Sequence, residues 1–510
     1  MNRSQTTGVS DRTVGPSHRS DAVVIAILAV ALSAAGSGRP SFWADEAATI
    51  SGSTRSLPEL WELTRNIDAV HGLYYLLMHG WFAVFPESEF WSRLPSALAV
   101  GVAAAGVVAL AKQMSTRTVA LTAGVMFAVL PRVTAAGIEA RSYAFTMAAA
   151  VWLLVVGVTA LRRDQRWLWL TYSLCLAMAT ALNVFCILMI GPLAAAALTL
   201  SPSRRALTSW AITSAVTSAL MAPFVIYTRS QSSQVDWIPP LGTRTLGELA
   251  VEQYFPHVYA FLFALLTVVV AVLAARRWRH DDAAAARDWP LAVTAVVWIV
   301  FPTVALLAYS VVRQPIYQPR YLSFTAPALA LLIGLCIVVV ARSRRRIVCL
   351  VALFAVTGAF NYVMQRAPFA KERMDYSQVA DVIAHHARPG DCLAFDVASS
   401  WKLIGPLKAA RPAAFSKLQD PGLLFSATEL DSLWDAHATI AAWGEHLGDC
   451  PSLWTISERD ATLPPHQRGE ALAPGPRLGS TAAYRVASTR GFRLVERWQF
   501  SMAQITRSQP

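Results

Sequence analysis

The chain has 510 residues, of which 55% are hydrophobic and only 15% are charged, and its mean hydropathy is +0.42. Repeated apolar runs approach the roughly 20 residues that cross a bilayer, which excludes a string of soluble domains and indicates a polytopic membrane protein. The net charge of +12 does not indicate nucleic-acid binding, because the basic residues fall in short clusters between apolar runs, as they do in cytoplasmic loops.

Residues 1–20 are polar, rich in Ser and Thr and weakly basic, so we expect a disordered cytoplasmic tail. The first apolar segment, Ala22–Ala35, ends in Ser33-Ala34-Ala35, which would also suit signal-peptide cleavage. We favour a retained helix, because cleavage there would leave the acid pair Asp45-Glu46 on an untethered N-terminus.

A long outer loop, residues 37–92, follows this first helix and carries the acid pair. Later in the loop, the run from His71 to Phe85 is apolar and aromatic but short and broken. We interpret it as a helix lying in the membrane interface, with its aromatic rings at headgroup level. A second true span is the alternative.

About eleven transmembrane helices are predicted between residues 21 and 362. They cover approximately 21–36, 93–111, 119–134, 142–161, 167–182, 184–200, 207–226, 255–275, 289–309, 319–342 and 347–362. With the N-terminus inside, every arginine cluster falls on the cytoplasmic side without adjustment. The same topology places four polar motifs together on the outer face, those around Asp45, His71, Arg141 and Arg320.

Residues 363–510 differ in composition and predict a small α/β domain outside the cytoplasm. An amphipathic helix from Tyr376 precedes a strand at Cys392–Val397, and strand-like stretches recur at 453–457 and 492–500. A disulfide between Cys392 and Cys450 is compatible with that location, although the sequence leaves it open. The other four cysteines lie in apolar runs, and no Cys or His spacing resembles a zinc site.

The outer polar motifs supply what transfer of a sugar from a lipid phosphate requires, namely a base for the acceptor hydroxyl and cations for the departing phosphate. Asp45 or Glu46 can serve as the base. Phosphate contacts are expected from Arg141, Arg320, Tyr143, Tyr321 and His71, and sugar or acceptor contacts from Trp43, Tyr74 and Glu139.

Several of these residues also have plainer interpretations. Trp43 and Tyr74 are typical of a membrane-interface belt, Arg320 of an interfacial anchor, and Glu139 of a local ion pair with Arg141. Two further loop acids, Asp68 and Asp236, are interpreted as solvated. A phosphate is already a good leaving group, so no metal or other cofactor is expected, although a divalent ion is not excluded.

Four motifs in this order resemble those of the bacterial membrane mannosyltransferases, which belong to the protein mannosyltransferase-like GT-C glycosyltransferases (family 39-like). The motifs are Asp45-Glu46, His71-Gly-Leu-Tyr-Tyr with Phe90-Trp-Ser-Arg-Leu-Pro, Glu139-Ala-Arg-Ser-Tyr143 and Pro319-Arg-Tyr321. The resemblance covers about residues 20–362. It departs from the family at Gly72, because the family usually has His-Pro-Pro where this chain has His71-Gly72.

The resemblance implies a polyprenyl-phosphate sugar donor, inversion at the anomeric carbon, and Asp45 as the general base. Mannose is the first choice of sugar, with arabinofuranose and aminoarabinose as alternatives. The acceptor, a lipid, glycan or protein of the cell envelope, is not identified by the sequence, nor is the oligomeric state. A transporter of an anionic lipid or solute is the main rival, but the ionisable residues collect at one rim rather than in mid-membrane. A structural scaffold would leave the acid pair unexplained.

Overall fold

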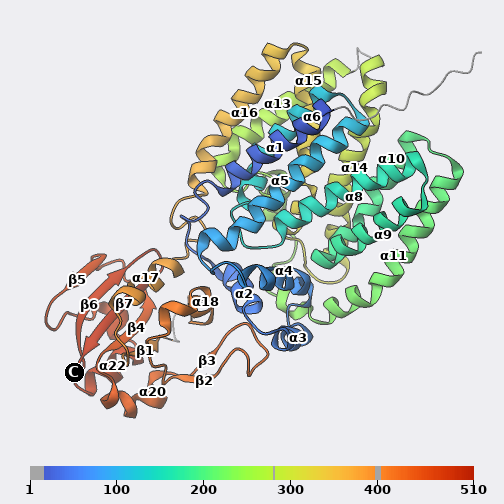
Figure 1. The fold of residues 1–510 in the computed structure, drawn as a ribbon. Coiled ribbons are helices and arrows are strands. Elements are labelled where there is room, and N and C mark those ends of the chain that lie inside the picture. Colours follow the sequence, from blue (N-terminus) through green and yellow to red (C-terminus); the bar gives the residue numbers. More distant parts are fainter. Residues whose placement is uncertain (1–15, 279–281, 397–403) are drawn as a thin grey trace, which may run out of the picture.

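A computed structural model describes residues 16–278, 282–396 and 404–510 (Figure 1). The chain forms a large bundle of helices and, at one end of it, a smaller domain built around a sheet. Of the predicted disordered tail, residues 1–20, the first fifteen lie outside the described residues. Residues 16–20 belong to the first helix, which begins at Pro16, so the tail was predicted five residues too long.

Each of the eleven predicted spans corresponds to a helix or to a pair of consecutive helical segments. These are α1 Pro16–Ala34, α5 Glu89–Met114, α6 Arg117–Val129 with α7 Pro131–Ala136, α8 Tyr143–Arg163, α9 Arg166–Leu182, η2 Val184–Met189 with α10 Ile190–Leu200, α11 Arg204–Ser230, α13 Phe261–Trp278, α14 Asp282–Val312, η6 Pro319–Thr325 with α15 Ala326–Ala341, and α16 Arg344–Met364. Within the described ranges, seven segments are long and apolar enough to cross a membrane, and three others are shorter apolar helices. The prediction of a polytopic helical protein is confirmed.

Small residues let the central helices approach one another closely. A side chain at Gly101 of α5 would meet Val30 of α1 at 2.4 Å. Likewise, a side chain at Gly334 of α15 would lie 2.6 Å from the backbone of Ala123 in α6. Close backbone approach through small residues is how helices gain packing energy where lipid removes the hydrophobic driving force between them. Helix α1 is thereby packed within the bundle.

A layer of short helices covers the end of the bundle next to the sheet domain. It comprises α2 Ala44–Ser53, α3 Leu57–Asn66, η1 Ala69–His71 and α4 Gly72–Phe82. At 1.5 Å per residue, α4 is about half as long as the hydrocarbon core is thick, so it does not form a second span. A further set of short helices joins α11 to α13, namely η3 Ser232–Val235, α12 Thr243–Gly247, η4 Glu248–Glu252 and η5 Val258–Ala260.

The C-terminal domain contains a five-stranded mixed sheet in the order β1-β4-β7-β6-β5. Its strands are β1 Cys392–Phe395, β4 Leu453–Glu458, β5 His466–Arg468, β6 Arg493–Gln499 and β7 Ala503–Gln509. Strand β1 pairs with β4 in parallel, and all the other pairs are antiparallel. A separate hairpin pairs β2 Leu423–Phe425 with β3 Ala436–His437. The helices are α17 Tyr376–His386, α18 Ile404–Ala410, α19 Pro412–Phe415, α20 Ile440–Trp443, η7 Gly444–Asp449, α21 Gly475–Gly479 and α22 Ala482–Thr489.

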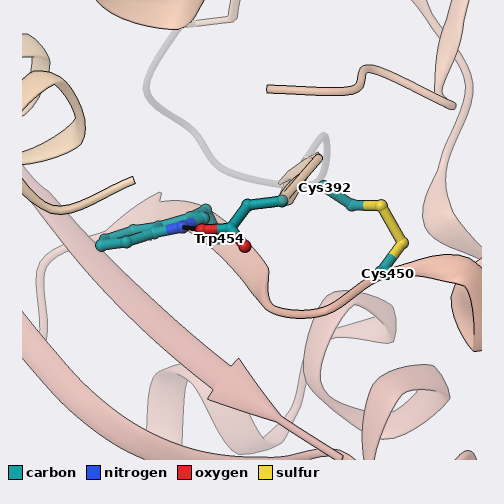
Figure 2. Close-up of a disulfide and its surroundings, with 4 residues drawn as sticks. Cys392, Cys450 and Trp454 are labelled. Carbon is teal, nitrogen blue, oxygen red and sulfur yellow. Dashed lines mark hydrogen bonds between the residues drawn. A yellow bond between two sulfur atoms is a disulfide. The ribbon is translucent and has the colours of Figure 1, made fainter. Parts of the chain in front are cut away.

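A disulfide joins Cys392, the first residue of β1, to Cys450, which lies shortly before β4 (Figure 2). Next to it, the indole N–H of Trp454 donates a hydrogen bond to Asp391 at 2.9 Å. The bridge that the sequence left open is therefore present, and it fastens the two parallel strands at their starts.

The C-terminal domain shares its hydrophobic core with the helix that carries the acid pair. Phe42, Ala47 and Ile50 pack in one cluster with Tyr376 and Ile383 of α17. Beside this cluster, the backbone N–H of Phe42 donates to the hydroxyl of Ser377 at 3.0 Å. Helix α2 is thus held by residues more than 300 positions later in the chain.

Candidate active site

A cavity of about 750 Å³ lies where the helix bundle, the short outer helices and the C-terminal domain meet. It is lined by the end of α9 and the start of η2, by the ends of α11 and α14, by the start of η6 and by the beginnings of α2 and α8. Among the described residues, its ionisable lining side chains include Asp45, Asp68, His71, Arg141, Arg229 and Arg320. Asp45, the first residue of the acid pair, therefore shares one cavity with residues of the other three predicted motifs, those around His71, Arg141 and Arg320.

Asp45 lies in the first turn of α2 and faces Arg320 of η6 across the cavity. The Asp45 carboxylate and the Arg320 guanidinium are 3.8 Å apart, and about a quarter of each side chain is exposed. The start of a helix favours a carboxylate, because the helix dipole places partial positive charge there. This loose pair leaves the carboxylate reachable from the cavity.

Two tryptophans hold the guanidinium of Arg320. Its central carbon lies 5.4 Å from the ring centre of Trp43 and 5.5 Å from that of Trp237. A cation over an aromatic face is attracted by the ring quadrupole, and Arg is the residue that most often makes this contact. The Arg320 Nε is buried and has no hydrogen-bond partner among the described residues.

Arg141 links the acid helix to the loop that carries His71. One of its terminal nitrogens donates to the backbone carbonyl of Asp45 at 3.2 Å, and the other lies 2.8 Å from His71 Nε2. Burial is the largest influence on Arg141 and disfavours its charge, but nearby Asp45, Tyr75, Tyr143 and Asp68 together outweigh it, so the pKa of Arg141 is raised and it remains a cation. Because a guanidinium can only donate, His71 Nε2 must be the acceptor.

His71 is a neutral imidazole in this setting. Burial lowers its pKa well below the ordinary value, and the cations Arg141 and Arg320 lower it further. The neutral ring accepts at Nε2 and therefore carries its proton on Nδ1, which is buried without a partner among the described residues. His71 can offer that N–H as a hydrogen-bond donor, but not a positive charge.

Asp68 is a second carboxyl group on the cavity wall, and its prediction as a solvated loop acid is wrong. Its side chain is buried and accepts a hydrogen bond from the Tyr75 hydroxyl at 2.7 Å. Burial raises its pKa, and only part of this is offset by Arg141 and by the Tyr75 hydrogen bond. Asp236, by contrast, is exposed and accepts from Gln314 at 2.7 Å, as a solvated loop acid would.

Glu46 lies away from the cavity in a fully buried ion pair with Arg93 of α5. Arg93 donates to both carboxylate oxygens, at 2.7 and 2.6 Å, and both side chains are completely inaccessible. Arg93 also donates to the carbonyls of Ser37, Pro40 and Ser41, and Glu46 accepts from the backbone N–H of Ala140 at 2.8 Å. Glu46 therefore fixes the start of α2 against two other segments, which leaves Asp45 to face the cavity.

The remaining predicted residues divide into two groups. Tyr143 and Tyr321 line the cavity beside Arg320. Tyr74, Glu139 and Trp43 are not among its lining residues. Tyr74 is fully buried with its ring edge-on to Phe145, and Glu139 pairs with Lys371 of the linker before α17 at 3.3 Å. Trp43 contacts the guanidinium of Arg320, which lines the cavity.

Besides Asp68, the residues to which sequence reasoning gave no role at this site include Arg93, Trp237 and Asn183. Arg93 stands at the start of an apolar run, and a charge in that position was the available signal for a buried partner. Trp237 is an aromatic residue in an otherwise polar outer loop. Asn183 breaks the apolar run between α9 and α10 and donates to the backbone carbonyl of Tyr321 at 3.1 Å. Within the ranges that the structure describes, no three His, Cys, Asp or Glu residues are grouped closely enough to hold a metal ion.

Two solved structures match nearly the whole chain. ArnT from Cupriavidus metallidurans in the apo state matches with a TM-score of 0.57 and 12% identity, over 96% of this chain and 97% of that one. The same protein bound to undecaprenyl phosphate matches with a TM-score of 0.54, again at 12% identity over 96% and 97%. The chain has the GT-C fold.

The GT-C assignment also has support from the sequence. Residues 73–227 match the family model described as dolichyl-phosphate-mannose-protein mannosyltransferase. That segment contains Arg141 and Tyr143 but neither Asp45 nor Arg320. No curated protein sequence matches the chain significantly. The GT-C fold and its multi-pass membrane topology are therefore established, whereas mannose as the sugar is not.

Proposed function

We propose that this protein is an inverting membrane glycosyltransferase that moves a sugar from a polyprenyl phosphate to a hydroxyl group of a cell-envelope acceptor. The observation that carries the proposal is the pairing of Asp45 with Arg320 and Arg141 in one cavity of a GT-C fold. Asp45 is the general base, and the two arginines hold the phosphate.

The charge balance of the cavity favours an anionic group. Its lining includes three arginines, Arg141, Arg229 and Arg320, against the two carboxyl groups of Asp45 and Asp68. Burial favours the protonated form of Asp68, which increases the positive excess. A guanidinium fork matches the geometry of phosphate oxygens, and Tyr143 and Tyr321 add neutral donors beside it.

The chemical step needs only groups that this chain provides. The acceptor oxygen attacks the anomeric carbon as Asp45 takes the hydroxyl proton, and the bond from that carbon to the phosphate oxygen breaks. The electron pair stays on the polyprenyl phosphate, whose additional negative charge Arg141 and Arg320 stabilise. Attack from the face opposite the phosphate inverts the anomeric centre. Glu46 has a positioning role, because it is locked to Arg93.

The rest of the cavity wall suits a prenyl chain. Ile187, Leu188, Val225, Ala305 and Leu306 line it on the side of the membrane helices. ArnT, which shares the fold, has been solved with undecaprenyl phosphate. In a polyprenyl phosphate, the phosphate would contact the arginines of the cavity and the prenyl tail would contact these apolar side chains.

We further propose that the cavity faces the outside of the plasma membrane. Each of the helices α8, α9, α11 and α15 has one end near the cavity and arginines at or next to its other end. The arginine-rich ends are expected in the cytoplasm, together with the N-terminus. The disulfide of the C-terminal domain is consistent with an oxidising compartment on the cavity side.

The test uses purified protein in nanodiscs with radiolabelled polyprenyl-phosphate mannose and a membrane-lipid extract as acceptor. Removing a general base typically costs between about 10² and 10⁴ in rate, so we expect Asp45→Asn to lose transfer by at least the lower figure. Asp236→Asn is the matched control, because Asp236 is an exposed acid near the cavity but not part of its lining, and it should retain wild-type transfer.

Folded Asp45→Asn protein with full activity would refute the assignment of the base. A wild-type protein that transfers arabinofuranose or aminoarabinose from the corresponding lipid phosphate, and not mannose, would correct the sugar. If it transfers none of the three, the glycosyltransferase proposal fails and transport of an anionic lipid becomes the leading explanation.

A further inference from the structure

A segment of the C-terminal domain reaches across to the cavity. This segment, residues 426–435, connects β2 to β3 and is called the strap below. Figure 1 shows the β2–β3 hairpin extending from the sheet domain toward α3. Two strap residues, Leu433 and Trp434, are part of the cavity lining, so the cavity is incomplete without the C-terminal domain.

The strap is attached to the outer helices by side chains that bind its backbone. The hydroxyl of Ser51 donates to the carbonyl of Leu433 at 2.7 Å, and the amide of Asn66 donates to that of Asp431 at 2.9 Å. Arg55, which is buried at the end of α2, donates to the carbonyl of Ser432. Three side chains from α2 and α3 and their connection thus fix consecutive carbonyls of the strap.

The strap is equally fixed on the side of its own domain. Asp435 pairs with Lys408 of α18 at 2.9 Å and accepts from the backbone N–H of Ala427 at 2.7 Å. Trp434 packs directly on Gly405, where any side chain would meet its Cβ at 2.3 Å. The absence of a side chain at Gly405 is what lets the indole of Trp434 sit between α18 and the cavity.

Trp434 and Leu433 belong to the part of the cavity wall that packs next to helix α2. Leu433 packs in the same hydrophobic cluster as Ala48, which is three residues after Asp45 and so on the same face of α2. Arg320 approaches Asp45 from η6, at the start of a membrane helix. In the proposed function, the donor's phosphate binds Arg320 and its prenyl tail lies among the apolar helix ends, so neither group needs the strap.

We propose that Trp434 is a specificity-determining residue that stacks on a sugar ring of the acceptor. The inference rests on the proposed glycosyltransferase function and adds the acceptor class, a glycan-bearing molecule rather than a bare alcohol or peptide. An indole face carries partial negative charge and complements the polarised C–H bonds on the apolar face of a sugar ring.

The experiment measures transfer from radiolabelled polyprenyl-phosphate mannose to three probe acceptors: a methyl mannoside, a mannose disaccharide and a Ser/Thr-containing peptide. We expect the wild type to prefer a sugar probe, and Trp434→Ala to raise the KM for that probe about tenfold while the KM for the donor stays the same. Trp434→Phe, which keeps an aromatic face, should recover most of the lost affinity.

Trp61→Ala is the matched control, because Trp61 is an exposed tryptophan of α3 outside the cavity lining, and its loss should change neither KM. An unchanged acceptor KM in Trp434→Ala, a rise in the donor KM instead, or a wild type that prefers the peptide would each overturn the role of Trp434 while leaving the proposed function standing. A wild type that transfers to no probe and to no component of a membrane-lipid extract would overturn both.

Discussion

Among the described residues, the two ends of the helix bundle differ in whether they contain buried arginines. At the end away from the cavity, Arg163, Arg205 and Arg345 are exposed, and arginines cluster where helices begin or stop. At the cavity end, Arg93, Arg141 and Arg366 are nearly or fully buried, and each donates to two or more groups. Counting basic residues in the sequence does not distinguish these two groups of arginines. The exposed arginines act through their position relative to the membrane, whereas the buried arginines act through specific hydrogen bonds.

We infer from this difference that replacing any one of the exposed arginines, which orient the protein in the membrane, has little effect on stability. Replacing a buried arginine should lower stability. An exposed charge keeps its hydration when a neighbour is lost. A buried ion pair that loses one partner leaves an uncompensated charge in a medium of low dielectric constant.

The largest effect is expected from breaking the Arg93–Glu46 pair. Arg93→Met leaves Glu46 buried without its bidentate partner, which should cost about 3–5 kcal/mol of stability. Thermal unfolding in detergent, with the yield of monodisperse protein, measures the loss. Arg345→Met is the matched control at the opposite end and should stay within about 0.5 kcal/mol of the wild type. Equal stability of the two variants would contradict the comparison.

A smaller effect is expected from Arg320→Lys. The variant keeps the positive charge but loses the planar fork and most of the contact with Trp43 and Trp237, so the KM for the lipid-phosphate donor should rise roughly tenfold. Initial rates against donor concentration give the value. Arg313→Lys, a change at an exposed arginine of the same end outside the cavity lining, should leave that KM unchanged. If Arg320→Lys and Arg313→Lys both keep the wild-type KM for the donor, the positive charge at position 320 is sufficient for donor binding and the planar guanidinium is not required.

The smallest effect concerns pH and His71. Because the folded state lowers the pKa of His71, the unfolded state binds its proton more readily once the pH falls below about 6.5. Stability attributable to His71 is therefore lost on acidification, by at most about 1.4 kcal/mol per pH unit. His71→Gln keeps an acceptor for Arg141 but does not titrate, so its stability should fall less between pH 7 and pH 5.5. His446→Gln, at an exposed position, serves as the control. A wild type and His71→Gln that respond identically to acid would show that His71 does not remain neutral.

The sequence was sufficient for those parts of the molecule that depend on local composition. Each of the eleven apolar runs coincides with a helix or with a pair of consecutive helical segments. Among the described residues, seven of these elements are long and apolar enough to cross a membrane, and three more contain shorter apolar helices. Asp45, Arg141 and Arg320 were predicted as a group because each stands at the rim of an apolar run, and the structure brings them to one cavity.

What the sequence could not provide depends on distant pairing. Glu46 looks as available as Asp45 until Arg93, 47 residues later, is seen to bind both of its oxygens. Asp68 looks solvated in a polar loop, and only the packing of Tyr75 and the cavity wall buries it. The residues next to Trp434 in the sequence do not indicate a function. Trp434 is positioned at the cavity because it packs on Gly405 and because Ser51, Arg55 and Asn66 bind the backbone of the strap.

The shared core between Phe42 and helix α17 has a consequence for how the protein is made. The helix with Asp45 leaves the ribosome early, whereas Tyr376 and Ser377, which hold it, follow only after all the membrane spans have been synthesised. The contacts of Phe42 and helix α2 with the C-terminal domain therefore form only after the last span has been synthesised, whereas the contacts of Glu46 with Arg93 and Ala140 involve residues that are made earlier. A chain that terminates before the C-terminal domain would lack both the contacts with that domain and the part of the cavity wall that Leu433 and Trp434 form.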